Sequence, residues 1–272
     1  MSARPVSAVA DRVCPLLKRE SLGGSYVLLT FEHPEVARAQ AGQFAMIQPE
    51  AETDLILRRP FSIMDTDPEA GHFTVFLKAV GPGSKAVFDL REGQGARVLG
   101  PLGHGFTPPS PGERAHLVGG GYGVAPFALF SRSLKGAFGP FHLFYGGRSA
   151  AELPLVAELE RRGITLTLAT DDGSRGEKGR VTAPLVKALD HDRGPARLYA
   201  CGPEAMMFAV AKIAEERGLP CEVSLDPWMG CGVGTCLGCV VKIQELGETK
   251  PKNRPACTEG PVFDSKRVVW PH

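Results

Sequence analysis

Short apolar or alternating runs dominate the first part of the chain. They are rich in Val, Leu and Phe, and Gly, Pro and Asp separate them; they cover 25–33, 42–49, 72–80 and 96–103. Many short runs between turn residues predict strands, and in this number they favour a small antiparallel barrel. Helical periodicity is scarce, although 85–93 could hold one short helix. Residues 1–107 are therefore expected to form a β-barrel domain.

The pattern changes after a proline-rich segment, "TPPSPGE" at 107–113, which we interpret as a linker. Strand-like runs now alternate with amphipathic helix-like runs, in segments that start at 115, 141, 164 and 196. This alternation predicts a doubly wound α/β domain with a parallel sheet, which we place at 108–222. Residues 223–272 form a small third region with strand-like runs at 239–246 and 267–270. The fold class is thus multi-domain: β-barrel, α/β domain, C-terminal module.

The composition is that of an ordinary globular protein, with 43% hydrophobic and 22% charged residues and a net charge of +1. No basic block or acidic tail suggests binding to nucleic acid or to a membrane surface. Asp11 and Arg12 interrupt the N-terminal segment, unlike a secretory signal. No apolar run approaches the roughly 18 residues that a transmembrane helix needs. The expected compartment is the cytosol.

Seven cysteines, an odd number, argue against a disulfide framework. Cys231, Cys236 and Cys239 have the spacing C-x4-C-x2-C, and Cys257 follows 18 positions later. Clusters of the plant-ferredoxin type use this spacing with a distant fourth cysteine. Glycines between the cysteines let the loop wrap closely and turn N–H groups toward sulfur. Structural zinc also takes four thiolates, but usually from two C-x2-C pairs, so the spacing favours [2Fe–2S] with zinc as the alternative.

Two barrel segments carry candidate anion-binding groups. In "RRPFSIMD" (58–65), the guanidinium of Arg59 suits phosphate, Phe61 could lie against a flat ring, and Ser62 adds a hydroxyl. The alternative is a barrel turn with a surface arginine. In "LKAVGPGSKAV" (77–87), a Gly-Pro-Gly-Ser turn leads into a helix and would expose N–H groups to an anion. An ordinary turn is the alternative there.

Two segments of the α/β domain suggest a dinucleotide. "LVGGGYGVAP" (117–126) places glycines after a buried strand and Pro126 in the first turn of a helix, a weak match to the dinucleotide fingerprint. "YACGPEAMM" (199–207) places Cys201 at the carboxyl end of a strand, where ligands lie in open α/β sheets. The alternatives are a structural tight turn and a small buried thiol. Arg148 could meet a 2′-phosphate or be a solvated turn residue, which leaves NAD and NADP both open.

The order of these motifs, "RPFS", "GPGS", "GGGYGVAP" and "CGPEAMM", resembles the ferredoxin–NADP reductase superfamily, in which a flavin barrel is joined to a nucleotide domain. The C-terminal "MGCGVGTCLGCVVK" and "ACTEGPVF", with "ATDDGSRGEKGRVT" at 169–182, are similar to the electron-transfer (iron–sulfur flavoprotein) subunit of class 1B dihydroorotate dehydrogenase. The resemblance covers nearly the whole chain and is most specific at 228–263. The chain departs from it mildly, with Phe61 where distant members have tyrosine and Ser84 where threonine is common.

The resemblance implies three redox groups and their binding residues. FAD would lie on the barrel, with the flavin and its phosphates held by Arg59, Pro60, Phe61 and Ser62, the flavin lined by Phe76, Leu77 and Lys78, and the pyrophosphate at Gly83 and Ser84. NAD would lie on the α/β domain at Gly119, Gly120, Gly121, Gly123, Val124, Gly202 and Pro203. The [2Fe–2S] cluster would be held by Cys231, Cys236, Cys239 and Cys257. Cys201 would act at the contact of nicotinamide and flavin, whereas Cys14 and Cys221 are expected not to be ligands.

The same resemblance implies a partner and a reaction. The partner would be an FMN-bearing catalytic subunit that oxidises dihydroorotate in pyrimidine biosynthesis, in a heterotetramer of two of each subunit. Electrons would pass from its reduced FMN through [2Fe–2S] and FAD to NAD⁺. Two alternatives stay open: a related reductase subunit that serves a sulfhydrogenase or an NADPH-linked enzyme, and a zinc-stabilised nucleotide-binding regulatory module without electron transfer.

Overall fold

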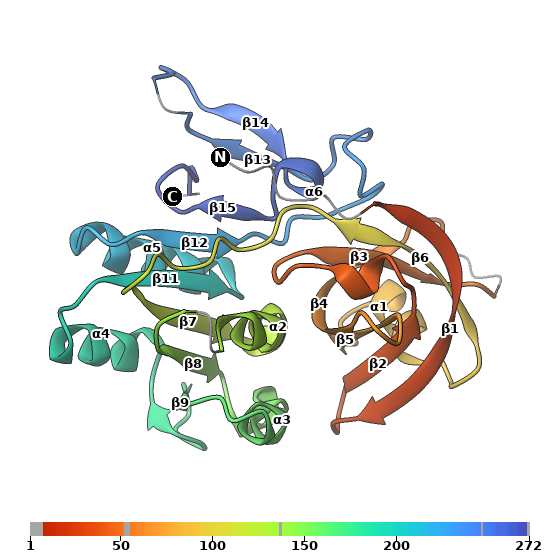
Figure 1. Ribbon diagram of the computed structural model, residues 1–272, viewed down its shortest axis with the longest axis horizontal. Coiled ribbons are helices and arrows are strands. Elements are labelled where there is room, and N and C mark those ends of the chain that lie inside the picture. Colours follow the sequence, from red (N-terminus) through yellow and green to blue (C-terminus); the bar gives the residue numbers. More distant parts are fainter. Residues whose placement is uncertain (1–7, 52–54, 136–137, 246, 271–272) are drawn as a thin grey trace.

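The computed structural model describes residues 8–51, 55–135, 138–245 and 247–270. A closed barrel and a sheet flanked by helices lie side by side, and the C-terminal region lies over both (Figure 1). No helix in these described ranges is long and apolar enough to cross a bilayer.

The barrel has six strands in the order β1-β2-β5-β4-β3-β6, and every neighbouring pair is antiparallel. The predicted antiparallel barrel is therefore confirmed. The short helix of this part begins at Pro82, a few residues earlier than the apolar pattern predicted, because proline suits the first turn. The elements are β1 (Ala10–Ser21), β2 (Tyr26–Glu32), η1 (Val36–Arg38), β3 (Phe44–Pro49), β4 (Arg59–Asp67), β5 (His72–Lys78), α1 (Pro82–Phe88) and β6 (Gly95–Leu102).

The second sheet has seven strands in the order β10-β9-β8-β7-β11-β12-β15, and all pairs except the last are parallel. Along β7, Leu117 packs on the side that carries α2 and α3, and Val118 packs on the side that carries α4 and α5, as alternation in a strand requires. The predicted doubly wound α/β domain is confirmed. Its elements are β7 (Arg114–Gly120), η2 (Gly121–Val124), α2 (Ala125–Leu134), β8 (Phe141–Gly147), η3 (Ala150–Glu152), α3 (Val156–Arg161), β9 (Leu166–Thr170), β10 (Glu177–Lys178), α4 (Thr182–His191), β11 (Ala196–Cys201), α5 (Glu204–Glu216) and β12 (Cys221–Ser224).

The C-terminal region is attached to the second sheet. After a loop come the hairpin β13 (Val240–Ile243) and β14 (Lys252–Pro255), α6 (Ala256–Glu259) and β15 (Val262–Asp264). Strand β15 pairs antiparallel with β12, so the predicted boundary between 222 and 223 falls inside a strand of the shared sheet. The prediction of a strand at 267–270 is wrong: Val268 makes one isolated bridge, to Ile243. A turn over 265–267 brings the chain back past β13, where the Gln244 N–H donates to the carbonyl of Arg267 and the Val269 N–H donates to the carbonyl of Lys242, a contact too short to form a strand.

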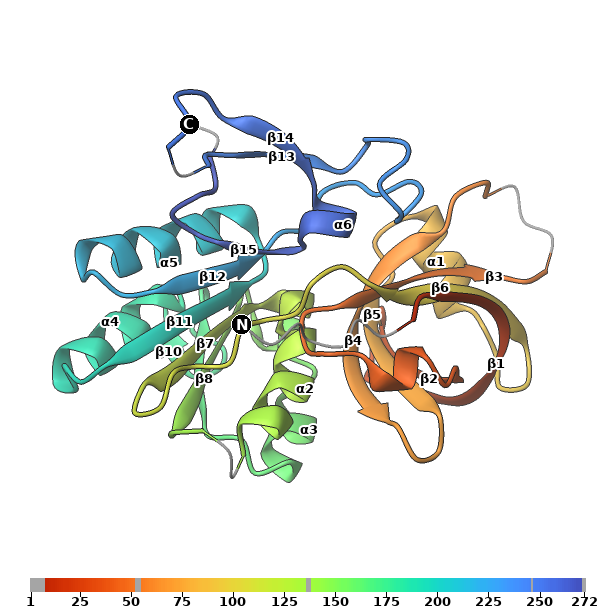
Figure 2. The ribbon, with the colours of Figure 1, turned by 45° about the horizontal axis from the view of Figure 1, so that its top comes forward.

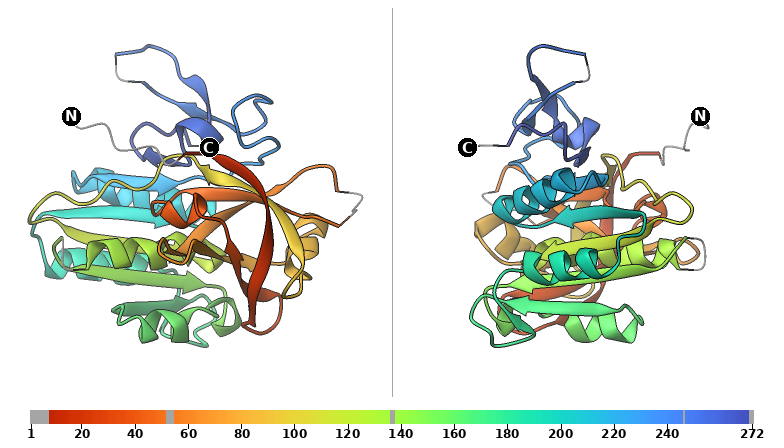
Figure 3. Two further views of the ribbon diagram at one scale, coloured as in Figure 1. Left: turned by 45° about the vertical axis from the view of Figure 1, so that its right-hand side comes forward. Right: turned by 90° about the vertical axis from the view of Figure 1, so that its left-hand side faces the viewer.

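An aromatic cluster joins the barrel to the second domain. Phe106, just after β6, stacks on Phe127 and Phe130 of α2 at centroid distances of 5.5 and 5.2 Å, and meets the edge of Tyr199 at 5.6 Å. The Tyr199 hydroxyl donates to the carbonyl of Thr107 at 2.8 Å. The barrel core and the α2 face of the sheet thus form one continuous set of buried side chains, and α2 lies between the sheet and the barrel (Figure 1). The two views of Figure 3 show the C-terminal region above both parts.

Candidate functional site

The four cysteines of the C-terminal region lie in two pairs. Cys231 and Cys236 share the loop after β12, and the Cys236 N–H donates to the Cys231 sulfur at 3.4 Å. Cys239, just before β13, and Cys257, in α6, are both buried in one small apolar cluster. The cluster also contains Phe44, Met46 and Leu102 of the barrel. Within the described ranges, no group of three or more His, Cys, Asp or Glu side chains is placed so that it could hold a single metal ion.

Backbone N–H groups of the loop point at the sulfurs, as the sequence predicted. Val233 donates to Cys231 at 3.5 Å, and Gly234 donates to Cys257 at 3.2 Å. Gly238 donates to Cys236 at 3.5 Å. Gly234 has φ +80°, which only glycine adopts readily, so this turn depends on the absence of a side chain.

The loop also sets the acidity of its thiols. Burial raises the pKa of Cys231, but N–H donors from Cys236 and Val233 outweigh it, and the pKa is lowered to about 6. Burial raises the pKa of Cys257 to about 12. Gly232 lies directly on the barrel, since a Cβ there would come within 2.7 Å of Met46 Cγ. Four thiols, N–H groups aimed at sulfur and close glycine packing fit an iron–sulfur group.

Strand β3 lies between this loop and the first barrel motif. Phe44 pairs in register with Ser62 of β4, and its ring packs beside Cys239 and Cys257. Met46 pairs with Pro60 and contacts the cysteine loop at Gly232. The motif at 59–62 therefore pairs with β3, and the buried cysteines Cys239 and Cys257 pack against side chains of the same strand. The sequence gives no sign of this arrangement. Figure 2 shows the C-terminal region reaching over this end of the barrel.

The two predicted anion-binding segments of the barrel meet. The Arg59 guanidinium lies against Gly83 at the start of α1, where a Cβ would overlap it. Arg59 donates to the carbonyls of Leu57 at 2.6 Å and Arg58 at 3.2 Å, which holds the side chain over the turn. Glycine at 83 therefore leaves room for a guanidinium beside a helix start. This cradle fits the phosphates of a dinucleotide such as FAD.

Ser84 organises that turn. Its hydroxyl accepts from the N–H of Val80 at 2.9 Å and of Gly81 at 3.1 Å, and it donates to the Gly81 carbonyl at 3.1 Å. Its contact with a pyrophosphate stays a prediction.

The end of β5 carries an aromatic and cationic group that the sequence shows only in part. Phe76 stacks on Tyr26 of β2 at 5.7 Å, and the Lys78 ammonium lies 5.1 Å from the Tyr26 ring centroid. The side chain of Leu77 is buried in the barrel core, so only its backbone could line a ligand here. Sequence reasoning missed Tyr26, because the pairing of β2 with β5 joins strands far apart in the chain. Lys78 also reaches Glu152 of the second domain at 3.6 Å.

The two predicted nucleotide segments interlock at the carboxyl ends of β7 and β11. Gly119 pairs in register with Cys201. A Cβ on Gly123 would come within 2.5 Å of Gly202 Cα, and one on Gly120 within 2.7 Å of Pro203. The close approach explains why these positions are glycines. It leaves a backbone-lined edge ahead of α2, which fits the pyrophosphate of NAD.

Arg148 follows β8 at the same edge of the sheet. Its Nε donates to Glu152 at 3.0 Å, and its backbone N–H donates to the same carboxylate at 3.1 Å. This pairing holds the pKa of Glu152 at about 2. Arg148 is thus an exposed residue with an acidic partner, which the sequence did not indicate.

Cys201 is buried, and burial raises the pKa of its thiol to about 12. The thiol is therefore neutral at pH 7, which suits packing against a ring better than nucleophilic chemistry. We expect Cys201→Ala to slow flavin reduction by NADH several-fold in stopped-flow measurements, because a packing contact at the reacting rings is lost. A rate equal to that of the unaltered protein would remove Cys201 from the site.

Together these features define a class of protein. An antiparallel barrel joined to a parallel-sheet nucleotide domain, with four cysteines in a C-terminal region that lies over the barrel, is an iron–sulfur reductase of the ferredoxin–NADP reductase type. Residues 117–212 match the oxidoreductase NAD-binding domain. Residues 226–269 match the iron–sulfur cluster binding domain of dihydroorotate dehydrogenase B, which favours iron–sulfur over zinc.

Curated relatives narrow the class. The chain is 36% identical over 243 residues to the electron transfer subunit of dihydroorotate dehydrogenase B (NAD(+)) of Desulforamulus reducens, covering 89% of this chain and 92% of the relative. It is 38% identical over 235 residues to the Shouchella clausii subunit, covering 85% and 87%. The chain therefore belongs to the family of electron transfer subunits of dihydroorotate dehydrogenase B.

A solved structure with the same fold is a chain of the NADH-dependent reduced ferredoxin-NADP oxidoreductase, from work on flavin-based electron bifurcation. The TM-score is 0.83 at 30% identity, over 95% of this chain and 90% of the other. The predicted superfamily and the order of barrel, nucleotide domain and iron–sulfur region are thus confirmed.

Proposed function

We propose that this chain passes electrons from the reduced FMN of a dihydroorotate dehydrogenase catalytic subunit, through [2Fe–2S] and FAD, to NAD⁺ in pyrimidine biosynthesis. The observation that carries the proposal is the position of β3 between the cysteine pair and the motif at 59–62. Nicotinamide takes two electrons as hydride, [2Fe–2S] passes one at a time, and a flavin does both. The residues of this chain contribute binding, orientation and exclusion of water.

The pairing of the thiols supports a two-iron cluster. Each iron of a [2Fe–2S] cluster takes two thiolates. Cys231 with Cys236, and Cys239 with Cys257, supply two such pairs. The second pair is buried against the barrel, which excludes water on the side that faces the proposed flavin site.

The first pair lies on an exposed apolar surface that fits a partner subunit. Trp228 is 94% exposed, and Leu237 is 59% exposed, with Cys236 beside it in the chain. Ile56 and Leu57 of the barrel continue this surface, since Leu57 Cδ1 lies 3.9 Å from the position of a Cβ on Gly230. Exposed apolar side chains gathered around a redox centre are typical of an interface. We propose that the FMN-bearing catalytic subunit docks here, in a heterotetramer of two of each subunit.

A second candidate function is a reductase subunit that serves another partner. The 30% identity to a chain of the NADH-dependent reduced ferredoxin-NADP oxidoreductase favours it. Both functions use the same barrel, nucleotide domain and cysteine loop. They differ in which chain donates electrons to the cluster.

Co-expression with the catalytic subunit of a dihydroorotate dehydrogenase B tests the assignment. We expect a stable complex with flavin and iron–sulfur absorption that reduces NAD⁺ when dihydroorotate is added, and NADP⁺ less efficiently. Reduced ferredoxin serves as the competing donor in a parallel assay. A chain that ignores the dihydroorotate dehydrogenase subunit but accepts electrons from ferredoxin would point to the second function, and a colourless zinc protein would contradict both.

A further inference from the structure

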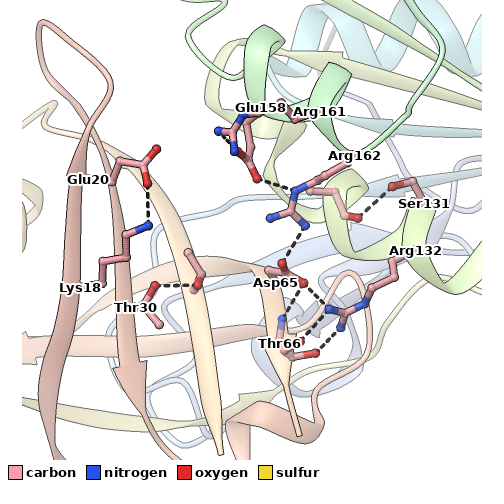
Figure 4. Close-up of polar contacts among 12 residues, drawn as sticks. Lys18, Glu20, Thr30, Asp65, Thr66, Ser131, Arg132, Glu158, Arg161 and Arg162 are labelled. Carbon is pink, nitrogen blue, oxygen red and sulfur yellow. Dashed lines mark hydrogen bonds and ion pairs between the residues drawn. The ribbon is translucent and has the colours of Figure 1, made fainter. Parts of the chain in front are cut away.

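A charged network ties the barrel to two helical segments of the nucleotide domain (Figure 4). Asp65 of β4 accepts from Arg132 of α2 at 2.6 Å and pairs with Arg162, just after α3, at 2.7 Å. Arg132 also donates to the Thr66 carbonyl and to the Thr66 hydroxyl, both at 2.7 Å. Arg162 is held in turn by Glu158 at 2.7 Å. One carboxylate of the barrel is thus shared by two arginines of the other domain.

The two elements joined here also carry the two ligand motifs. Strand β4 begins with the motif at 59–62 and reaches Asp65 three residues later. Helix α2 begins directly after the glycine-rich turn at 119–124 and reaches Arg132 in its last turn. Any rotation of α2 relative to β4 therefore moves the glycine-rich turn relative to the barrel motif.

Apolar packing and charged hydrogen bonds both act across this interface, and they have different effects on how the two domains are held. Phe106, Phe127 and Phe130 hold the domains together, but apolar packing is largely non-directional. The guanidinium of Arg132 has its donors in a fixed plane and meets three acceptors at once, so it defines an angle. Without the Asp65 carboxylate, Arg132 would lose one of its three acceptors, and Arg162 would keep Glu158 of its own domain but lose its partner on the barrel.

We propose that Asp65 is a positioning residue that sets the angle between the barrel and the nucleotide domain, and through it the approach of nicotinamide to flavin. The proposal rests on the proposed function for its kinetic consequence only. Hydride transfer depends steeply on the distance and alignment of the reacting atoms. A small rotation at the interface is therefore enough to slow the reaction while both ligands stay bound.

The first test measures the position of the two domains relative to each other in the full chain without cofactors. Spin labels are attached through non-natural amino acids at the exposed positions Glu69, in the barrel, and Arg193, in the nucleotide domain. Pulsed electron paramagnetic resonance then gives the distribution of distances between the two labels. We expect Asp65→Asn to broaden or shift the distance distribution. Glu20→Gln is the matched control, because it breaks an ion pair with Lys18 (2.9 Å) inside β1, and it should leave the distribution unchanged.

The second test follows flavin bleaching by NADH in a single turnover of the FAD-loaded chain. We expect Asp65→Asn to lower the limiting rate about 10-fold, with the NADH dissociation constant and the FAD content within about twofold of the unaltered protein. Arg132→Lys keeps the charge but loses the fork of donors, so it should slow the reaction in the same direction by less. Glu20→Gln should react at the normal rate.

The outcomes separate this proposal from the function on which it rests. If NADH does not bleach the flavin of the unaltered chain, the proposed function fails, and the distance distributions still decide whether Asp65 sets the angle. An unchanged distribution in Asp65→Asn overturns the proposal whatever the rates are. A changed distribution with an unchanged bleaching rate overturns the positioning role as well.

Discussion

Replacing Cys257 with serine is expected to remove the iron–sulfur cluster and to lower dihydroorotate-dependent reduction of NAD⁺ at least about 100-fold. Cys257 is buried beside Cys239 and accepts the Gly234 N–H at 3.2 Å, so its sulfur belongs to the better shielded pair. A serine oxygen is a poor substitute for thiolate toward iron in such a cluster. NADH oxidation with an artificial acceptor should continue, because the barrel and nucleotide motifs are untouched. Iron and sulfide analysis and visible absorption measure the loss of the cluster. Assays of dihydroorotate-dependent NAD⁺ reduction and of NADH oxidation with an artificial acceptor show whether only the first activity is lost.

Cys14→Ser is the matched control. Cys14 is also a buried cysteine, but it lies in the barrel core on β1, away from the apolar cluster of Cys239 and Cys257. This variant should lose some thermal stability and keep its iron. If Cys257→Ser lost both activities while FAD stayed bound, the cluster would not be separable from NADH oxidation, and the proposed order of electron carriers would be wrong.

Arg59→Ala is expected to weaken FAD binding about 10- to 100-fold, the range for losing one charged hydrogen-bonding group. The guanidinium lies against Gly83 beside the start of α1, where the phosphates of FAD are proposed to bind. Removing it leaves a turn with N–H groups but no positive charge. Titration of the cofactor-free chain with FAD, followed by flavin fluorescence, measures the change.

The neighbouring Arg58, directly before β4, offers a control. Arg58 pairs with Asp11 of β1 at 2.8 Å, so it is engaged in a different contact from Arg59. Arg58→Ala removes the same charge from the chain and should leave FAD affinity within about twofold, since the Arg58 guanidinium pairs with Asp11, whereas the atoms nearest Gly83 belong to Arg59. Equal losses in both variants would show that general charge, and not the cradle at Gly83, attracts the cofactor.

The sequence by itself determined the local elements and the kind of chemistry. Apolar runs identified four of the six barrel strands (β2, β3, β5 and β6, but not β1 or β4), and the change to strand–helix alternation identified the parallel sheet, because these periodicities depend on neighbouring residues only. The spacing of Cys231, Cys236, Cys239 and Cys257, with glycines between, was enough to predict a four-thiolate site. The prediction of a strand at 267–270 was wrong although its apolar residues are strand-like, because the segment meets β13 only briefly, at the bridge between Val268 and Ile243.

Only the tertiary structure decided which of these parts meet. Closure of the barrel places Tyr26 beside Lys78 and puts β3 between the motif at 59–62 and the buried cysteines. Packing of α2 on the barrel brings Arg132 to Asp65, and β15 joins the sheet of another domain through β12. These contacts join residues far apart in the chain, and their register follows from how whole elements close and pack. No short stretch of sequence carries that information, because each contact depends on two distant segments at once.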